Sequence, residues 1–133
     1  MIIKMVIYEL IKETKEKLDY SYYPEGNKDK KAGLITIDRI NEKIDLTEVA
    51  EGDYEIVVLA EDLLRMDQSF IDLAEEEGDL ERARLLREEL EENKKKGKYR
   101  GFQYYCYACH VIHNLVKKYN SGIIPQSDTV YWY

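Results

Sequence analysis

The spacing of apolar residues changes along this chain, and that change restricts the fold more than any other feature. The first third is rich in β-forming residues, with stretches where apolar and polar side chains alternate, as in strands that bury one face. The middle of the chain has apolar residues at helical spacing, and the last seven residues are β-rich again. We therefore expect an α+β fold, in which an antiparallel sheet of about four strands packs against three helices.

An antiparallel meander is predicted for the first third. The segment IIKMVIYELI is rich in β-forming residues, although its spacing also permits a helix, and KLDYSYYPEG places Leu18, Tyr20 and Tyr22 on one face. The polar stretch EGNKDKKAG is short enough to connect a hairpin, and GLITIDRINEKIDL alternates again. We expect the C-terminal segment SDTVYWY to pair back into this sheet.

Three helices are predicted after the meander. The first begins at Asp53, a suitable N-cap, carries more than one apolar stripe and ends at Gly78. The second is capped by Asp79 and has an apolar face over residues 80–90. The third runs from about residue 100 to residue 119, and Gly122 is placed to end it. The first two helices would form an antiparallel hairpin.

Size and charge restrict the class of protein. A chain of 133 residues fits a single domain (1–133), and its 44% hydrophobic and 35% charged residues are typical of a soluble globular protein. No apolar run approaches a membrane span, and the N-terminus lacks the features of a signal peptide, so we expect a cytoplasmic protein. The net charge of −7 argues against nucleic-acid binding and favours a basic partner.

The segment CYACHVIH contains the residues that most resemble a reactive site. Cys106, Cys109, His110 and His113 are spaced to share one helix face. This row is too long for one tetrahedral zinc ion, although a neighbouring Cys–His pair could chelate a metal with ligands from elsewhere. The Cys-x-x-Cys-His spacing also matches covalent haem attachment, and a Cys106–His110 nucleophile pair is a third option. Simple packing of a buried helix is the preferred interpretation, so no cofactor is expected.

Tyrosine is the strongest compositional signal. The chain has 12 Tyr against 2 Phe and 1 Trp. Tyrosine suits positions that are half buried and half wet, as in protein-binding surfaces, and cross-strand aromatic pairs within a small sheet explain the same residues equally well. The predicted partner-binding residues are Tyr20, Tyr22, Tyr23, Asp53, Tyr54, Tyr131, Trp132 and Tyr133.

In size, charge, tyrosine content and α+β plan the chain resembles the small acidic immunity proteins of bacterial toxin systems. The stretches YSYYPEG, GLITID and the terminal WY look like features of small bacterial proteins. This resemblance implies a protein that binds and neutralises a toxin, and it designates no particular binding residue.

We therefore expect a non-catalytic protein-binding module, in the form of an immunity protein that neutralises a basic toxin. A metal- or haem-binding protein that uses the row Cys106, Cys109, His110 and His113 is the alternative function. A homodimer through the leucine face of residues 80–90 is a third hypothesis.

Overall fold

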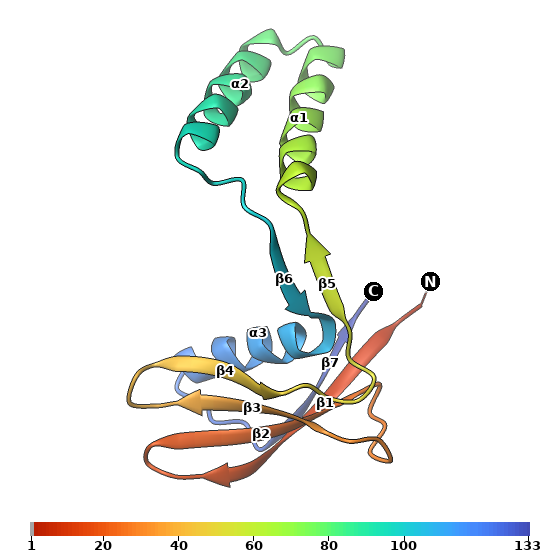
Figure 1. Ribbon diagram of the computed structural model, residues 1–133, viewed down its shortest axis with the longest axis vertical. Helices are drawn as coiled ribbons and strands as arrows, with labels where there is room; N and C mark the ends of the chain where they lie inside the picture. Colours follow the sequence, from red (N-terminus) through yellow and green to blue (C-terminus); the bar gives the residue numbers. More distant parts are fainter. Residues whose placement is uncertain (1) are drawn as a thin grey trace. The chain divides into compact units, whose positions relative to one another are not determined.

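The computed structural model describes residues 2–133 and confirms the α+β class. The chain separates into two compact units, which are described one at a time below (Figure 1). The first consists of the residues up to Ile56 together with Tyr104–Tyr133, and the second of Val57–Gln103.

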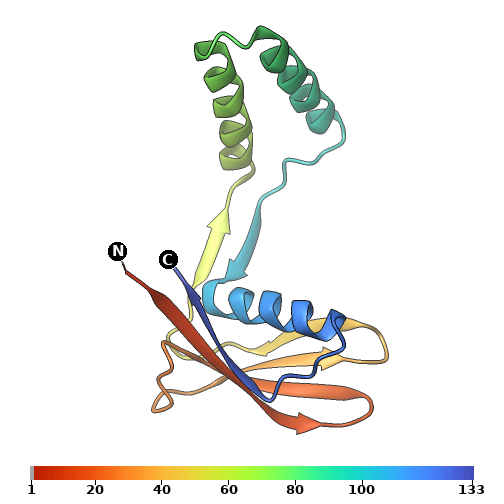
Figure 2. The same ribbon diagram turned by 180° about the vertical axis from the view of Figure 1, so that it is seen from behind.

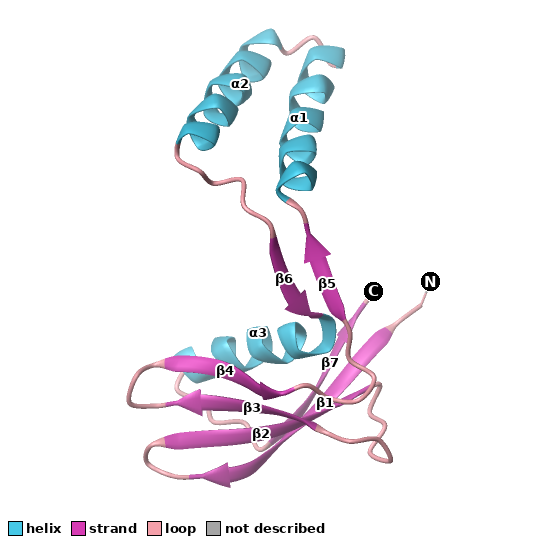
Figure 3. Ribbon diagram, in the orientation of Figure 1, coloured by secondary structure: helices cyan, strands magenta, loops and turns pink. Residues whose placement is uncertain are grey.

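The first unit is built on a five-stranded antiparallel sheet with the strand order β4-β3-β2-β1-β7 (Figure 3). Its strands are β1 (Lys4–Glu13), β2 (Lys17–Pro24), β3 (Gly33–Asp38), β4 (Lys43–Glu48) and β7 (Ser127–Trp132). The predicted meander and the return of the C-terminal strand are both confirmed. The sheet has one strand more than expected, because the segment from residue 33 to residue 46 bends into a hairpin.

A tight turn causes this bend. The Asp38 carboxylate accepts hydrogen bonds from the backbone N–H groups of Ile40 and Asn41, both at 3.0 Å. Glu42 then adopts a positive φ of 52° and returns the chain toward β4. Aspartate favours such turns because its carboxylate can accept hydrogen bonds from the backbone N–H groups two and three residues later, in place of a backbone carbonyl.

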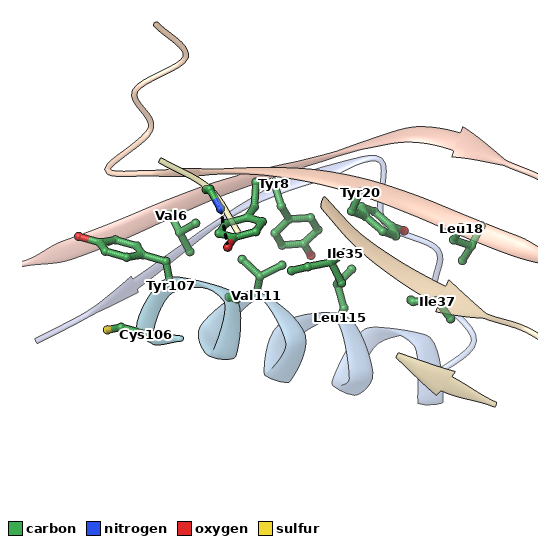
Figure 4. Close-up of a cluster of buried hydrophobic side chains, with 13 residues drawn as sticks. Val6, Tyr8, Leu18, Tyr20, Ile35, Ile37, Cys106, Tyr107, Val111 and Leu115 are labelled. Carbon is green, nitrogen blue, oxygen red and sulfur yellow. Dashed lines mark hydrogen bonds between the residues drawn. The ribbon is translucent and has the colours of Figure 1, made fainter. Parts of the chain in front are cut away.

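Helix α3 (Cys106–Asn120) lies across one face of this sheet (Figure 2). Every second side chain of the strands faces α3, such as Val6 and Tyr8 of β1. These side chains pack against Val111 and Leu115 of α3 (Figure 4). These four side chains have no exposed surface. The core of the first unit therefore follows directly from the period of two in its strands and the helical period of α3.

Much of the tyrosine content belongs to this core. Tyr8 and Tyr20 are fully buried and meet edge to face, with ring centroids 5.6 Å apart. The Tyr8 hydroxyl donates to Asn114 Oδ1 at 2.5 Å, and the Tyr20 hydroxyl donates to the Pro125 carbonyl oxygen at 2.9 Å. Burial raises the pKa of Tyr20 to about 12, so the hydroxyl keeps its proton. Tyrosine serves here as a large core residue whose polar end is satisfied.

The second unit holds an antiparallel helical hairpin of α1 (Ala60–Glu76) and α2 (Leu80–Lys95). Its buried side chains are Ile71 and Ala74 on α1 and Ala83 and Leu90 on α2. Gly78 has a φ of 76°, and the Asp79 carboxylate accepts from the Arg82 N–H at 3.1 Å, so the predicted helix end and cap are confirmed.

Two predicted helix starts are wrong. The helix expected from Asp53 begins at Ala60, because Glu55–Val58 forms β5. The helix expected from about residue 100 begins at Cys106, because Phe102–Tyr105 forms β6. The strands β5 and β6 pair in a small separate sheet. Each strand is four residues long, and periodicity does not separate so short an apolar run from one turn of helix.

Candidate partner-binding site

The Asp53 carboxylate lies at the N-terminal end of α3 and accepts four hydrogen bonds. Oδ1 accepts from the N–H groups of Tyr54 at 2.8 Å and Tyr107 at 2.9 Å. Oδ2 accepts from the Ala108 N–H at 3.1 Å and the Tyr22 hydroxyl at 2.8 Å. Asp53 therefore caps a helix, as its residue type indicates, but that helix starts more than fifty residues later in the chain. The negative charge is well placed against the helix N-terminus.

The Tyr22 hydroxyl joins this carboxylate to the sheet. It donates to Asp53 and accepts from the N–H of Ala50 at 3.0 Å. Gly33 leaves room for the ring, since a Cβ atom at that position would lie 2.0 Å from Tyr22 Cε1. Burial raises the pKa of Tyr22 well above its ordinary value. Tyr22 and Asp53 are thus committed to internal contacts and offer little to a partner.

A row of aromatic rings begins beside Asp53. The rings of Tyr54 and Tyr107 meet edge to face with centroids 6.1 Å apart, and Tyr107 meets Trp132 in the same way at 5.2 Å. The indole of Trp132 then stacks on His110, with centroids 3.9 Å apart and planes inclined by 15°. Tyr54 is 43% exposed and Trp132 is half-buried, so the row is partly open to solvent.

Charged groups meet the hydroxyls of this row. The Tyr107 hydroxyl donates to Glu25 Oε2 at 2.6 Å, and the Lys4 ammonium donates to the Tyr54 hydroxyl at 2.7 Å. The same ammonium lies 5.1 Å from the Tyr54 ring centroid. That separation follows from its position at the hydroxyl edge, so the contact is a hydrogen bond rather than a cation over the ring face.

The predicted partner-binding residues are spread over several places. Three of them have internal roles: Tyr20 and Tyr22 are core residues, and Asp53 caps α3.

The other predicted residues are at least partly exposed. Tyr54 and Trp132 belong to the aromatic row, whereas Tyr23 is half-buried on β2. Tyr131 and Tyr133 are 65% and 83% exposed. Since successive strand residues point to opposite faces, Tyr131 lies across the sheet from Trp132. Around Tyr107 the structure gathers Asp53, Tyr54 and Trp132, and it joins Tyr22 to Asp53 from the core side.

The Cys and His row on α3 is distributed between core and surface. Cys106 is buried, Cys109 and His110 are half-buried, and His113 is exposed. Burial raises the pKa of Cys109, which opposes formation of the reactive thiolate. Burial, and secondarily His113, lowers the pKa of His110. Within residues 2–133, no three His, Cys, Asp or Glu side chains gather where they could hold a metal ion.

An exposed apolar row, on α1 and its N-cap residue Leu59, carries no motif that marks it as a site in the sequence. Leu59, Met66, Phe70 and Leu73 are 49%, 52%, 47% and 45% exposed, and Leu63 between them is half-buried. We call these five residues the α1 row. The signal in the sequence is that α1 carries more than one apolar stripe, whereas a hairpin of two helices buries only one of them. The stripe with Ile71 and Ala74 is the buried one.

Charge is distributed unequally between the two helices of the hairpin. Helix α1 carries six carboxylates against one arginine, whereas α2 has five acidic and five basic residues. Asp62, Asp72 and Glu76 follow the side of the α1 row that points away from the buried stripe. The exposed apolar surface of α1 is therefore bordered by negative charge.

A groove of about 180 Å³ opens beside this row, between α1 and α2. Phe70, Leu86 and Leu90 form its apolar walls, and Asp67, Glu89 and Asn93 form its polar rim. Asp67 Oδ2 also accepts from the Tyr99 hydroxyl at 2.5 Å, which ties the segment after α2 to α1. Such an arrangement can receive an apolar side chain and hold a cation at the rim.

Comparisons of the chain with protein-family models, with curated proteins and with solved structures find no match. None of the helices among residues 2–133 combines the length and the hydropathy required to cross a membrane.

Proposed function

We propose that this protein is a non-catalytic protein-binding module whose partner docks on the α1 row and is basic. The observation that carries this proposal is the α1 row itself, in which four large apolar side chains are about half exposed along an acidic helix. Soluble proteins rarely leave so continuous an apolar surface on a regular element unless another molecule covers it.

The size of the row agrees with a docking role. Covering the exposed half of one such side chain would contribute about 1 kcal/mol to the free energy of binding, and the row has four of them. Even before the entropic cost of association is subtracted, the total of about 4 kcal/mol corresponds to a dissociation constant of only about 1 mM. Useful affinity therefore requires further contacts, which the neighbouring groove and the carboxylates can provide. Opposite charge on the partner would also raise the association rate and make it sensitive to salt.

We propose that the partner is a basic toxin and that this protein neutralises it. The small size, the acidic character and the tyrosine content of the chain support this form of the function. The test is to co-express the protein with each basic protein encoded beside its gene. Rescue of growth from one toxic neighbour, together with a stable complex, is the expected result, and absence of any such pair contradicts the toxin-neutralising role.

The α1 row can be tested in the same complex. Met66→Ser with Phe70→Ser removes apolar surface without adding charge and should weaken binding at least tenfold, as measured by calorimetry. Leu85→Ser is the matched control, because Leu85 is 52% exposed on α2 and is not part of the row. Equal binding by both variants would place the docking surface elsewhere.

A further inference from the structure

We propose that the part of the partner that docks on the α1 row is a basic amphipathic α-helix. This inference rests on the proposed function and adds the shape, the length and the charge of the docking element. Three observations support it: the spacing of the row, the groove beside it and the charge of α1.

The spacing of the α1 row is that of a helix–helix seam. On the helix, Leu63, Met66, Phe70 and Leu73 follow one another at intervals of three, four and three residues, which is the spacing of the a and d positions of a heptad repeat. Leu59, the N-cap residue, lies four residues before Leu63 and extends the row. Side chains at this spacing leave holes that accept the side chains of a second helix. The ends of the row are 14 residues apart, or about 21 Å along the axis, so the docked helix would make about four turns.

The groove provides an anchor point in the middle of this seam. Phe70 belongs both to the α1 row and to the groove wall, opposite Leu86 and Leu90 of α2. A leucine or an aromatic residue of the docked helix would enter there and lose contact with water. Central apolar anchors of this kind contribute a large share of the binding energy in helix-in-groove complexes.

Charge indicates a basic partner rather than a second copy of this chain. Docking of two α1 helices would bring together two elements that each carry six carboxylates and one arginine. On α2, Arg84 already pairs with Glu81 and Glu88, at 2.5 Å and 2.8 Å. Arg87 likewise pairs with Glu75 of α1. Lysine or arginine along the flanks of the docked helix would meet Glu76 and Asp62, which lie beside the row; Asp62 now forms an exposed pair with Arg65 of α1 at 3.6 Å.

The experiment uses the full chain and two labelled peptides of about 14 residues. One peptide has leucine at the a and d positions and lysine elsewhere, and the other has the same composition in an order that forms no apolar face. Fluorescence anisotropy should show the first peptide binding at least tenfold more tightly. The double variant Met66→Ser, Phe70→Ser should lose at least tenfold of that affinity, and Leu85→Ser less than twofold. Circular dichroism verifies that each variant is folded.

Several results would overturn the inference. Equal binding of the two peptides would mean that charge alone attracts them, and an equal loss in the double variant and in Leu85→Ser would mean that they dock elsewhere. A wild-type dimer that the double variant converts to a monomer in sedimentation would show that a second copy covers the row. If the natural partner requires Phe70 while the helical peptide does not bind, the helix inference fails and the proposed function stands. If the natural partner ignores Phe70, both fail.

Discussion

The two units of this protein differ in the size of the side chains that their cores bury. In the first unit, the sheet and α3 bury large side chains completely, and the hydroxyls of Tyr8, Tyr20 and Tyr22 have internal partners. In the second unit, the buried side chains of the two helices are Ile71, Ala74, Ala83 and Leu90, while Met66, Phe70 and Leu73 are about half exposed. The first unit resembles an ordinary core, and the second resembles half of an interface.

Under the proposed function, the residues that stabilise the fold and those that bind the partner belong to different units. An inner strand of the sheet has neighbours on both sides and α3 on one face, so the apolar residues on that face are covered. A helix in a two-membered hairpin has one neighbour, which covers one stripe. We expect substitutions in the first unit to change stability and substitutions in the α1 row to change binding.

The largest expected effect is at the cap of α3. Asp53→Ala removes the acceptor of four hydrogen bonds and leaves the Tyr22 hydroxyl and the first N–H groups of α3 without that partner. We expect a loss of about 3 kcal/mol in the free energy of unfolding, measured in urea. Asp53→Asn keeps the shape and part of the bonding and should cost about half as much. An unchanged midpoint for Asp53→Ala would show that Asp53 does not anchor α3.

Tyr22→Phe should have the next largest effect. The variant keeps the ring but removes the bond to Asp53 and orphans the buried N–H of Ala50, so we expect a loss of about 2 kcal/mol. The matched control is Tyr131→Phe, at a side chain that is 65% exposed. It should change the unfolding midpoint by less than about 0.5 kcal/mol. Similar losses in both variants would refute the separation of buried from surface tyrosines.

The α1 row should matter less for stability than the buried stripe of the hairpin. Phe70→Ser should lower the free energy of unfolding by about 1 kcal/mol, because only about half of the ring is buried. Leu90→Ala, at a side chain that is only 6% exposed in the same hairpin, should cost about 2 kcal/mol. Native-state hydrogen exchange of the α1 and α2 amides measures both. A larger loss for Phe70→Ser than for Leu90→Ala would reverse the assignment of the two stripes.

The smallest expected effect is a dependence on pH at the end of the aromatic row. Burial and then His113 hold the pKa of His110 below 6.5 in the folded protein. The folded state therefore binds fewer protons than the unfolded state in this range, so stability should fall slightly as the pH drops below 6.5. Trp132, the single tryptophan, is stacked on His110 and should lose fluorescence when the imidazole is protonated.

The His113→Gln variant sharpens this measurement. It removes the neighbouring charge and should shift the fluorescence midpoint upward toward 6.5, because His113 lowers the pKa of His110. The His110→Gln variant is the control and should remove the transition. A midpoint above 6.5 in the wild type would contradict the buried, stacked position of His110.

Individual residues show how far the sequence could be used. The prediction that Asp79 is a cap is confirmed, because its helix follows immediately and the Arg82 N–H donates to it. The prediction that Asp53 caps the next helix is wrong, because the N–H groups that donate to it belong to Tyr107 and Ala108, far along the chain. Tyr20 and Tyr131 are both in alternating strands, but only the first lies under α3. A single strand pattern does not show which of its faces will be covered.

By itself, the sequence determined the class of the fold, the strands β1, β2, β3 and β7, and the core of the second and third helices. These features depend on the local period of apolar residues and on caps that act within one turn. Only the tertiary structure decided that Asp53 caps α3 and that one apolar stripe of α1 stays exposed. It also decided which of the tyrosines predicted to bind a partner lie in the core and which lie on the surface. Each of these outcomes depends on which distant element packs on a given side chain, and local spacing does not carry that information.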